Sequence, residues 1–233
     1  MKKLVQQITA WSFSRWATHS GENGCPFKAY LKFIKKLPEP AGLAMVRGGR
    51  IHQLAEAALT APKLAVPPEL VTVKPTLTRL RRLSAQPELE LALTSAWAKT
   101  GWFDKNAWLR LKIDAIAAVT KDRRVVEVVD WKTGRYRPDS KAHQLQLELY
   151  GAGVLSAYSN VDKVHTRLTF TDHDQKTAPP AKATFTRADL PRLQQAWAGR
   201  AQSMLADTRF SPRPGWYCRS CHFRKANGGP CVY

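Results

Sequence analysis

Acidic side chains are scarce in this sequence, and long apolar runs are absent. Its 233 residues hold 18 Asp and Glu against 37 Lys and Arg, a formal net charge of +19. No stretch approaches the ~18 consecutive apolar residues of a membrane-spanning helix, and no internal repeat or low-complexity block is visible. Residues 1–7 are basic and polar and contain no apolar signal core. We therefore expect a cytoplasmic protein that makes no use of a membrane.

The composition that remains is that of a folded, strongly basic protein. Hydrophobic residues make up 44% of the chain, which includes eight Trp, so a disordered basic tail is excluded. The length predicts one to two domains, and the order of the predicted elements favours a single domain over residues 1–233. A charge of +19 exceeds the ~2–8 of a typical small domain. It favours a nucleic-acid partner, because Lys and Arg neutralise phosphates and release counterions; solubility alone is the alternative.

Apolar periodicity predicts a mixed α/β order of elements, with helices first and a β meander after them. Residues 62–75 are rich in proline and predict an irregular surface connection. Helices are expected over 9–16, 26–36, from after Gly48-Gly49 to 59, 76–85, 140–158 and 188–207, and strands over 89–97, 108–119, 125–131, 164–171 and 182–186.

Two aspartates and a lysine lie on neighbouring predicted strands. Asp130 and Lys132 are two residues apart, so they share a face of their strand. A hairpin turn centred on Asp122 places Asp114 directly opposite Asp130, with Cβ atoms ~5 Å apart. Two carboxylates this close favour a Mg²⁺ or Mn²⁺ ion between them, which would activate a water for attack on a phosphate. The alternative is a solvated strand face with ordinary ion pairs.

Three further polar residues surround this pair in the predicted fold. His52 lies on the third helix, beside its apolar stripe. Gln146 and Tyr150 are four residues apart on the helix after Lys132, so they share a face and could hold a phosphate or the lysine. Glu127 points to the opposite face of its strand from Asp130 and is left out of the predicted metal site. His52, Gln146 and Tyr150 are each also compatible with a purely structural role.

The four cysteines lie near the two ends of the chain. Cys25 is alone, whereas Cys218 and Cys221 form a Cys-x2-Cys pair that Cys231 follows. This is not the disulfide pattern of a small secreted domain. Four thiolates suit a [4Fe–4S] cluster or a Zn²⁺ ion that would hold the terminal segments, about 20–36 and 210–233, together. Unrelated thiols or one reducible disulfide are the alternatives.

Taken in their order along the chain, these motifs resemble the PD-(D/E)XK nuclease superfamily, specifically its RecB-like and AddB-like branch. CRISPR-associated iron–sulfur exonucleases belong to the same branch. Leu111 departs from the branch, which often has Gly at that place. The resembling segments are Ser12-Phe-Ser14, Cys25-Pro26-Phe-Lys-Ala-Tyr30, Gly48-Gly-Arg-Ile-His52, Leu111-Lys-Ile-Asp114, Val128-Val-Asp130-Trp-Lys132-Thr-Gly134, Gln146-Leu-Glu-Leu-Tyr150 and Phe210 to Cys231.

The resemblance implies a restriction-endonuclease-like core, a mixed β-sheet flanked by helices. It implies a Mg²⁺ or Mn²⁺ site, a lysine that activates water, two residues that support the lysine and the phosphate, and a four-cysteine [4Fe–4S] cluster, with Zn²⁺ as the alternative. The implied residues are, as metal ligands, His52, Asp114 and Asp130, with the Trp131 carbonyl; as catalytic residues, Asp114, Asp130, Lys132, Gln146 and Tyr150; and at the cluster, Cys25, Cys218, Cys221 and Cys231.

The chain contains no Gly-x4-Gly-Lys-Ser/Thr phosphate loop, so no helicase motor is expected within it. The resemblance therefore implies a stand-alone DNA exonuclease that acts on DNA ends or single strands in recombination, repair or CRISPR adaptation. Two alternatives stay open. One is a non-catalytic DNA-binding or scaffold protein on the same fold, and the other is an RNA-binding protein with structural zinc.

Overall fold

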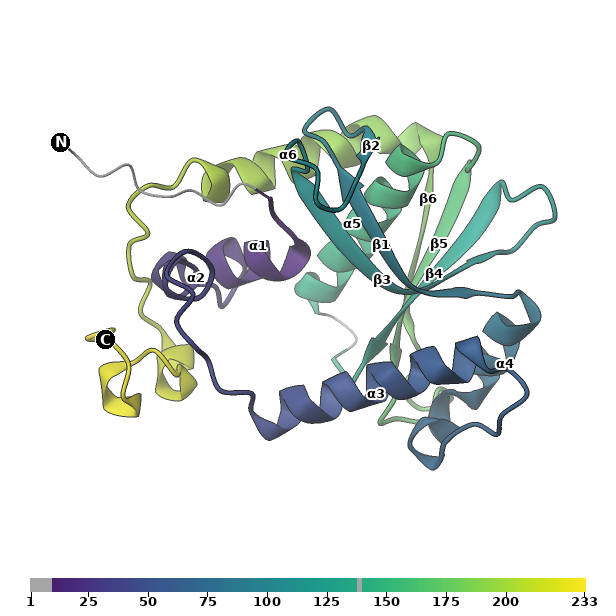
Figure 1. Ribbon diagram of the computed structural model, residues 1–233, viewed down its shortest axis with the longest axis horizontal. Coiled ribbons are helices and arrows are strands. Elements are labelled where there is room, and N and C mark those ends of the chain that lie inside the picture. The colour runs from purple at the N-terminus through teal and green to yellow at the C-terminus, as the bar shows by residue number, and fades with distance from the viewer. Residues whose placement is uncertain (1–9, 138–139) are drawn as a thin grey trace. The chain divides into compact units, whose positions relative to one another are not determined.

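The computed structural model describes residues 10–137 and 140–233 (Figure 1). Its contacts divide the chain into two compact units. The first, here the sheet unit, is Ala41–Gln194, and the second, here the terminal unit, combines Met1–Pro40 with Gln195–Tyr233. The start of the helix predicted from residue 9 lies outside the described residues. The prediction of one domain over residues 1–233 stays a prediction.

A six-stranded mixed sheet forms the centre of the sheet unit, in the order β2-β1-β3-β4-β5-β6. β4 and β5 are parallel, and the other neighbours are antiparallel. α5 (Lys141–Ala157) makes the crossover that the parallel pair requires. This confirms the predicted mixed α/β fold. The strands are β1 (Gln86–Leu93), β2 (Lys99–Thr100), β3 (Leu109–Ala118), β4 (Val125–Lys132), β5 (Lys163–Phe170) and β6 (Ala181–Thr186).

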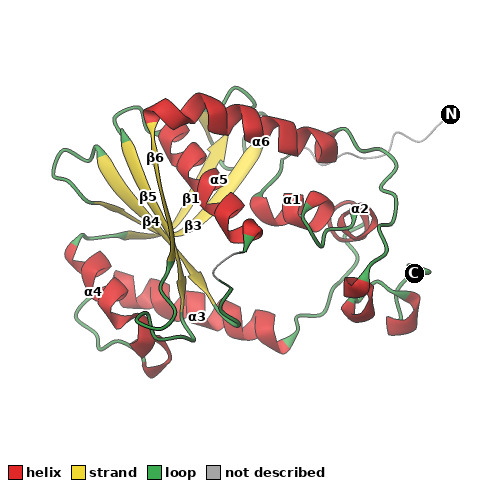
Figure 2. Ribbon diagram, turned by 180° about the vertical axis from the view of Figure 1, so that it is seen from behind, coloured by secondary structure: helices red, strands yellow, loops and turns green. Residues whose placement is uncertain are grey.

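Helices cover both faces of this sheet (Figures 1 and 2). On one face, α3 (Leu43–Thr60) and α4 (Lys74–Arg82) pack with the fully buried Val129 and Trp131 in one apolar cluster. On the other face, α5 approaches the strands closely at two glycines. A Cβ on Gly151 would lie 2.4 Å from a ring carbon of Phe185. The small residues of α5 therefore set how near this helix lies to the sheet.

Two predicted boundaries near α3 and α4 are wrong. α3 begins at Leu43, before Gly48 and Gly49, because glycine in a helix interior costs only ~1 kcal/mol and ends a helix only where the chain turns away. The connection over 62–75 is not simply exposed, because Pro68–Val73 forms a 3₁₀ helix that buries Leu70 completely. α4 already begins at Lys74, so Pro75 stands in its first turn, where proline needs no amide partner.

The terminal unit contains α1 (Phe13–Ser20), α2 (Pro26–Ala29) with a π-helical turn after it (Tyr30–Ile34), and the part of α6 (Leu190–Leu205) from Gln195 on. Its core is a tryptophan cluster. The Trp197 ring lies 5.8 Å from that of Trp11 and 5.2 Å from that of Trp16, and Trp16 Nε1 donates to Arg200 O. Among the described helices, none is both long and apolar enough to span a membrane.

Candidate active site

The register of β3 and β4 brings the two predicted aspartates to neighbouring positions. Ala115 pairs with Val129 and Ala118 with Val126, the register predicted from a turn centred on Asp122. One step further along, Asp114 and Asp130 leave the ladder, and Asp114 Oδ2 accepts a hydrogen bond of 2.7 Å from Trp131 N. Both carboxylates are buried, at 8% and 4% exposure. The end of this strand pair therefore holds two carboxylates out of bulk water.

α3 adds an imidazole to this end of the sheet. His52 Nδ1 lies 3.1 Å from Asp114 Oδ1, and its side chain is 34% exposed. The neighbouring Ile51 and Ala55 are buried, so they fix the rotation of the helix that points His52 at the strands. One turn earlier, Gly48 lies against the loop after β4, where an added Cβ would be 3.4 Å from Thr133 Oγ1. The Gly-x3-His spacing thus presents one helix face to the site.

Glu88 completes a group that the sequence analysis missed. One ligand atom each of His52, Glu88 and Asp114 lie within 4.8 Å of one another, a group able to hold a metal ion. The strand was predicted to begin at Leu89, which left Glu88 in a turn. The sequence carries no signal for this residue: it is the observed pairing of Leu89 with Ile113 in the sheet that puts Glu88 at the position opposite Asp114. Glu88 has a φ of +50°, a left-handed backbone that takes its side chain out of the regular alternation.

Asp130 lies outside that three-residue group and has its own partners. Its Oδ1 accepts from Tyr150 OH at 2.6 Å and from Gln146 Nε2 at 3.0 Å. Its Oδ2 is buried 2.6 Å from Lys132 Nζ and has no aligned hydrogen-bond donor among the described residues. Gln146 and Tyr150 were predicted to support Lys132 or a phosphate. Their hydrogen bonds orient Asp130, and a role toward Lys132 or a phosphate stays a prediction.

The proton affinities of these groups follow from burial and crowding. Burial and the charge of Asp130 raise the pKa of Asp114 above its usual range. The hydrogen bond with Asp114 raises the pKa of His52. Burial and the two carboxylates raise the pKa of Tyr150 well above its ordinary value, so its hydroxyl keeps its proton and donates it. The two neighbouring carboxylates thus share a buried place in which a positive charge is favoured.

The donor set fits a divalent cation. Imidazole nitrogen together with several carboxylate oxygens is typical of sites for Mg²⁺, Mn²⁺ and related ions. Asp130 Oδ2 adds a buried oxygen without an aligned donor. A cation here would oppose both causes of the raised pKa of Asp114, its burial first and the charge of Asp130 second. Four of the predicted site residues, His52, Asp114, Asp130 and Lys132, therefore lie in one place, with Gln146 and Tyr150 behind them.

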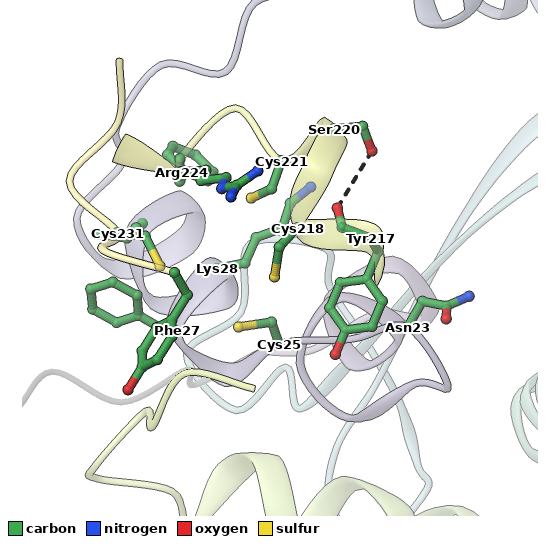
Figure 3. Close-up of a pocket in the computed structure, with 13 residues that line it drawn as sticks. Asn23, Cys25, Phe27, Lys28, Tyr217, Cys218, Ser220, Cys221, Arg224 and Cys231 are labelled. Carbon is green, nitrogen blue, oxygen red and sulfur yellow. Dashed lines mark hydrogen bonds between the residues drawn. The ribbon is translucent and has the colours of Figure 1, made fainter. Parts of the chain in front are cut away.

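In the terminal unit, all four cysteines line a single hollow of about 160 Å³ (Figure 3). Each is a free thiol and is partly exposed. Figure 3 shows Cys25 and Cys218 with their sulfurs toward each other, and Cys221 and Cys231 on the same hollow. Backbone amides donate to two of the sulfurs, Arg213 N to Cys25 and Gly215 N to Cys218, each at 3.4 Å. Four converging thiols fit a tetrahedral zinc ion or an iron–sulfur cluster.

Comparisons with known proteins agree with this geometry. The chain is 12% identical in sequence to a protein from Eubacterium rectale named "putative exonuclease", whose crystal structure it matches with a TM-score of 0.52 over 97% of this chain and 89% of that one; at this identity the likeness shows the fold alone. The crystal structure of SSO0001 is 16% identical over 94% of this chain and 86% of that one, with a TM-score of 0.42, too low to carry an argument. No curated protein matches the sequence.

A family model described as "PD-(D/E)XK nuclease superfamily" matches residues 10–226, which include parts of both units. The chain therefore belongs to the PD-(D/E)XK nuclease superfamily.

Proposed function

We propose that this protein is a Mg²⁺- or Mn²⁺-dependent deoxyribonuclease of the RecB-like and AddB-like branch, acting as a stand-alone exonuclease on DNA ends or single strands. Superfamily membership makes the chain a hydrolase of nucleic acid that uses a divalent metal. One observation carries the proposal: His52, Glu88 and Asp114 converge beside the ion pair of Asp130 and Lys132. The Eubacterium rectale protein named "putative exonuclease" shares this fold, and exonuclease action is the activity that we propose for this chain.

His52, Asp114 and Asp130 would hold the metal, with Glu88 as a fourth donor. When bound, a divalent ion lowers the pKa of a water and stabilises charge on a phosphate. Asp114 is held in place by Trp131 N, and Asp130 by Tyr150 and Gln146. These bonds fix the two carboxylates before substrate arrives, which is the preorganisation that catalysis requires.

Lys132 is the residue that, in this proposal, acts on the attacking water. Its ammonium lies 2.6 Å from Asp130 Oδ2, and its side chain is 25% exposed. It can therefore reach solvent and substrate while Asp130 keeps it at the site. In this place it orients the water and donates to the scissile phosphate, whose negative charge grows as the new P–O bond forms.

The test is digestion of end-labelled linear DNA and of circular DNA, single- and double-stranded, with Mg²⁺, Mn²⁺ or chelator. We expect metal-dependent loss of linear DNA and survival of circles, because an exonuclease needs an end. Asp130→Asn should abolish cleavage and preserve DNA binding, whereas Asp122→Asn, in the exposed β3–β4 turn, should leave both unchanged. Full activity of Asp130→Asn would refute the catalytic assignment. If the wild-type protein binds DNA but cleaves it with neither metal, the scaffold alternative would be favoured.

We also propose that Cys25, Cys218, Cys221 and Cys231 hold a [4Fe–4S] cluster between segments 20–36 and 210–233. The shared hollow and the two amide–sulfur hydrogen bonds support four thiolates acting on one group. Anaerobically purified protein should show broad visible absorbance and contain iron. Colourless protein that contains about one zinc per chain would favour structural zinc. Cys25→Ser should lose the metal and destabilise the fold, because metal binding and folding are coupled.

A further inference from the structure

The sheet unit contains a second polar hollow, of about 210 Å³, which the proposed nuclease chemistry does not use. It lies where α4 meets β4, β5 and β6. A cavity that holds one water needs only ~10–15 Å³, so this hollow has room for a larger polar group. Its charged and polar lining comprises Arg79, Glu127, His165, Thr166, Arg167, Lys182 and Thr184.

Cations crowd this hollow. Arg167 on β5 stands directly opposite Lys182 on β6, and like charges at such a cross-strand position repel each other. The Arg167 guanidinium, with burial and Arg79, lowers the pKa of Lys182 below its ordinary value. Burial likewise lowers the pKa values of Arg79 and Arg167. Three cations therefore share one partly buried place.

Among the described residues that line the hollow, a single carboxylate faces these cations. Glu127 is 4% exposed and accepts hydrogen bonds from both Arg79 Nη1 and Arg167 Nε. Its single negative charge leaves two of the three positive charges without a counter-charge among the residues that line the hollow. Arg79 Nη2 is buried and has no hydrogen-bond partner among the described residues, although arginine presents five donors that usually find acceptors. The missing element is an anion with several acceptor oxygens.

We propose that this hollow binds a phosphate group, from a free phosphate ester or from a nucleic-acid strand. A phosphate monoester, a dianion, matches the two uncompensated charges, a strand phosphodiester neutralises one of them, and guanidinium forks match the oxygens of either. The scissile phosphate is a different group. Glu127 precedes Asp130 by three residues, hence ~10 Å along β4 and on the opposite face. The proposal thus goes beyond the metal centre and does not depend on it.

The test measures binding in chelator, where no cleavage occurs. The probes are inorganic phosphate, a deoxynucleoside 5′-monophosphate, and a single-stranded oligonucleotide with or without a 5′-phosphate. Lys182→Gln removes one exposed cation from the hollow, and Lys105→Gln makes the same charge change at an exposed position outside it. We expect Lys182→Gln to weaken phosphate binding about tenfold, the effect of one lost charged hydrogen bond, and Lys105→Gln to leave it unchanged.

A second variant, Thr184→Glu, places a carboxylate at the exposed β6 side of the hollow. It should raise the unfolding temperature without ligand, because it opposes the cations, and it should remove the stabilisation that phosphate gives. If the two variants lose binding of the mononucleotide, the hollow is assigned to a free phosphate ester. If they lose binding of the oligonucleotide alone, the hollow is assigned to a nucleic-acid strand. Equal binding of every probe by the wild type, Lys182→Gln and Thr184→Glu would overturn the proposal.

Discussion

Glu88 is the residue whose role the fold alone reveals. Its left-handed backbone and its place in the group with His52 and Asp114 indicate a metal donor. In the described structure its Oε2 pairs with Lys112 Nζ at 2.6 Å. A non-glycine residue at positive φ costs of order 1 kcal/mol or more, and such strain often accompanies function.

Glu88→Gln should therefore raise the Mn²⁺ concentration for half-maximal cleavage by at least about tenfold, because it removes one anionic donor. A metal titration of the initial cleavage rate measures this. Glu90→Gln, at an exposed position on the same strand, is the matched control. Identical metal dependence of the two variants would exclude Glu88 from the metal site.

Tyr150 is buried and donates to Asp130 Oδ1, so it should act by positioning the carboxylate. Tyr150→Phe should lower stability by about 1 kcal/mol, the net value of a typical hydrogen bond, and should slow cleavage less than Asp130→Asn does, since Gln146 still holds Asp130. Urea unfolding and the cleavage rate at saturating metal measure the two effects. Tyr158→Phe, just after the end of α5, is the control; a cleavage rate as low as that of Asp130→Asn would point to a direct role.

At the residue scale, the sequence predicts what a regular hairpin determines. The polar turn around Asp122 is enough to place Asp114 beside Asp130, and the helical spacing of Gln146 and Tyr150 is enough to place both on one face. It could not predict Glu88, because a positive φ breaks the two-residue alternation of a strand. Nor could it show that Tyr150 bonds to Asp130 instead of Lys132, since that depends on how α5 packs.

Among the elements, the loop after β4 is held in place from two sides. Asp172, just after β5, accepts from both terminal nitrogens of Arg47 on α3, at 2.7 and 2.6 Å, and from Gly134 N at 2.6 Å. Those hydrogen bonds lower the pKa of Asp172, with Arg47 the larger cause. The loop follows Lys132 directly, so this network fixes where the catalytic segment ends.

Asp172→Ala should release this loop without removing a catalytic group. We expect the cleavage rate to fall about tenfold, in the range seen when supporting residues are lost, and the Gly134 amide to exchange its hydrogen faster. Hydrogen exchange followed by mass spectrometry and steady-state cleavage measure these outcomes. Asp174→Ala, exposed two residues further on, should change neither. Slower cleavage with unaltered Gly134 exchange would contradict a positioning role.

In the terminal unit, α1 is tied to the chain after α6. His19 Nε2 lies 2.9 Å from Asp207 Oδ2. Burial lowers the pKa of His19 below its ordinary 6.5, despite the raising effect of Asp207. Because the unfolded chain then takes up a proton more readily, the stability from neutral His19 is complete above pH 6.5 and is lost as the pH falls below it.

The free energy of unfolding should therefore decrease between pH 7 and pH 5, and His19→Gln should show a shallower decrease. Urea unfolding at intervals across this range measures both slopes. Asp207 adds nothing between pH 7 and pH 5, because hydrogen bonds outweigh its burial and lower its pKa from the ordinary 3.8. A wild type and a His19→Gln variant with parallel profiles would show that His19 does not couple folding to pH.

At the element scale, the sequence predicted a helix or strand correctly where the residue pattern and the residues that end the element agree. β4 and α5 were predicted within two residues of their ends, since β-branched residues mark the strand and Ser140 caps the helix with a hydrogen bond to His143 N. The prediction failed at α3, because two glycines were read as a boundary while the helix begins before them, where Arg47 pairs with Asp172. Tertiary contacts decide such cases over local propensity.

Across the whole molecule, the excess of 37 basic over 18 acidic residues is a physical property that belongs to no single site. Composition alone predicted a nucleic-acid partner, and superfamily membership agrees with it. The sequence also predicted that cysteines from both ends act together, and the structure places them on one hollow. Which group they bind depends on thiolate chemistry that composition does not distinguish.

This charge makes a quantitative prediction about substrate binding. For single-stranded DNA, the logarithm of the binding constant falls by ~0.7 per neutralised phosphate for each tenfold rise in salt. If about six phosphates are contacted, binding measured in chelator should weaken at least one-hundredfold between 50 and 200 mM salt, as estimated from that slope. Fluorescence anisotropy with a labelled oligonucleotide measures the slope. The urea midpoint over the same salt range should change little, because stability rests on buried apolar contacts that salt does not screen. A slope corresponding to one or two phosphates would mean that the positive charge serves solubility, and that the substrate is held chiefly at the metal centre.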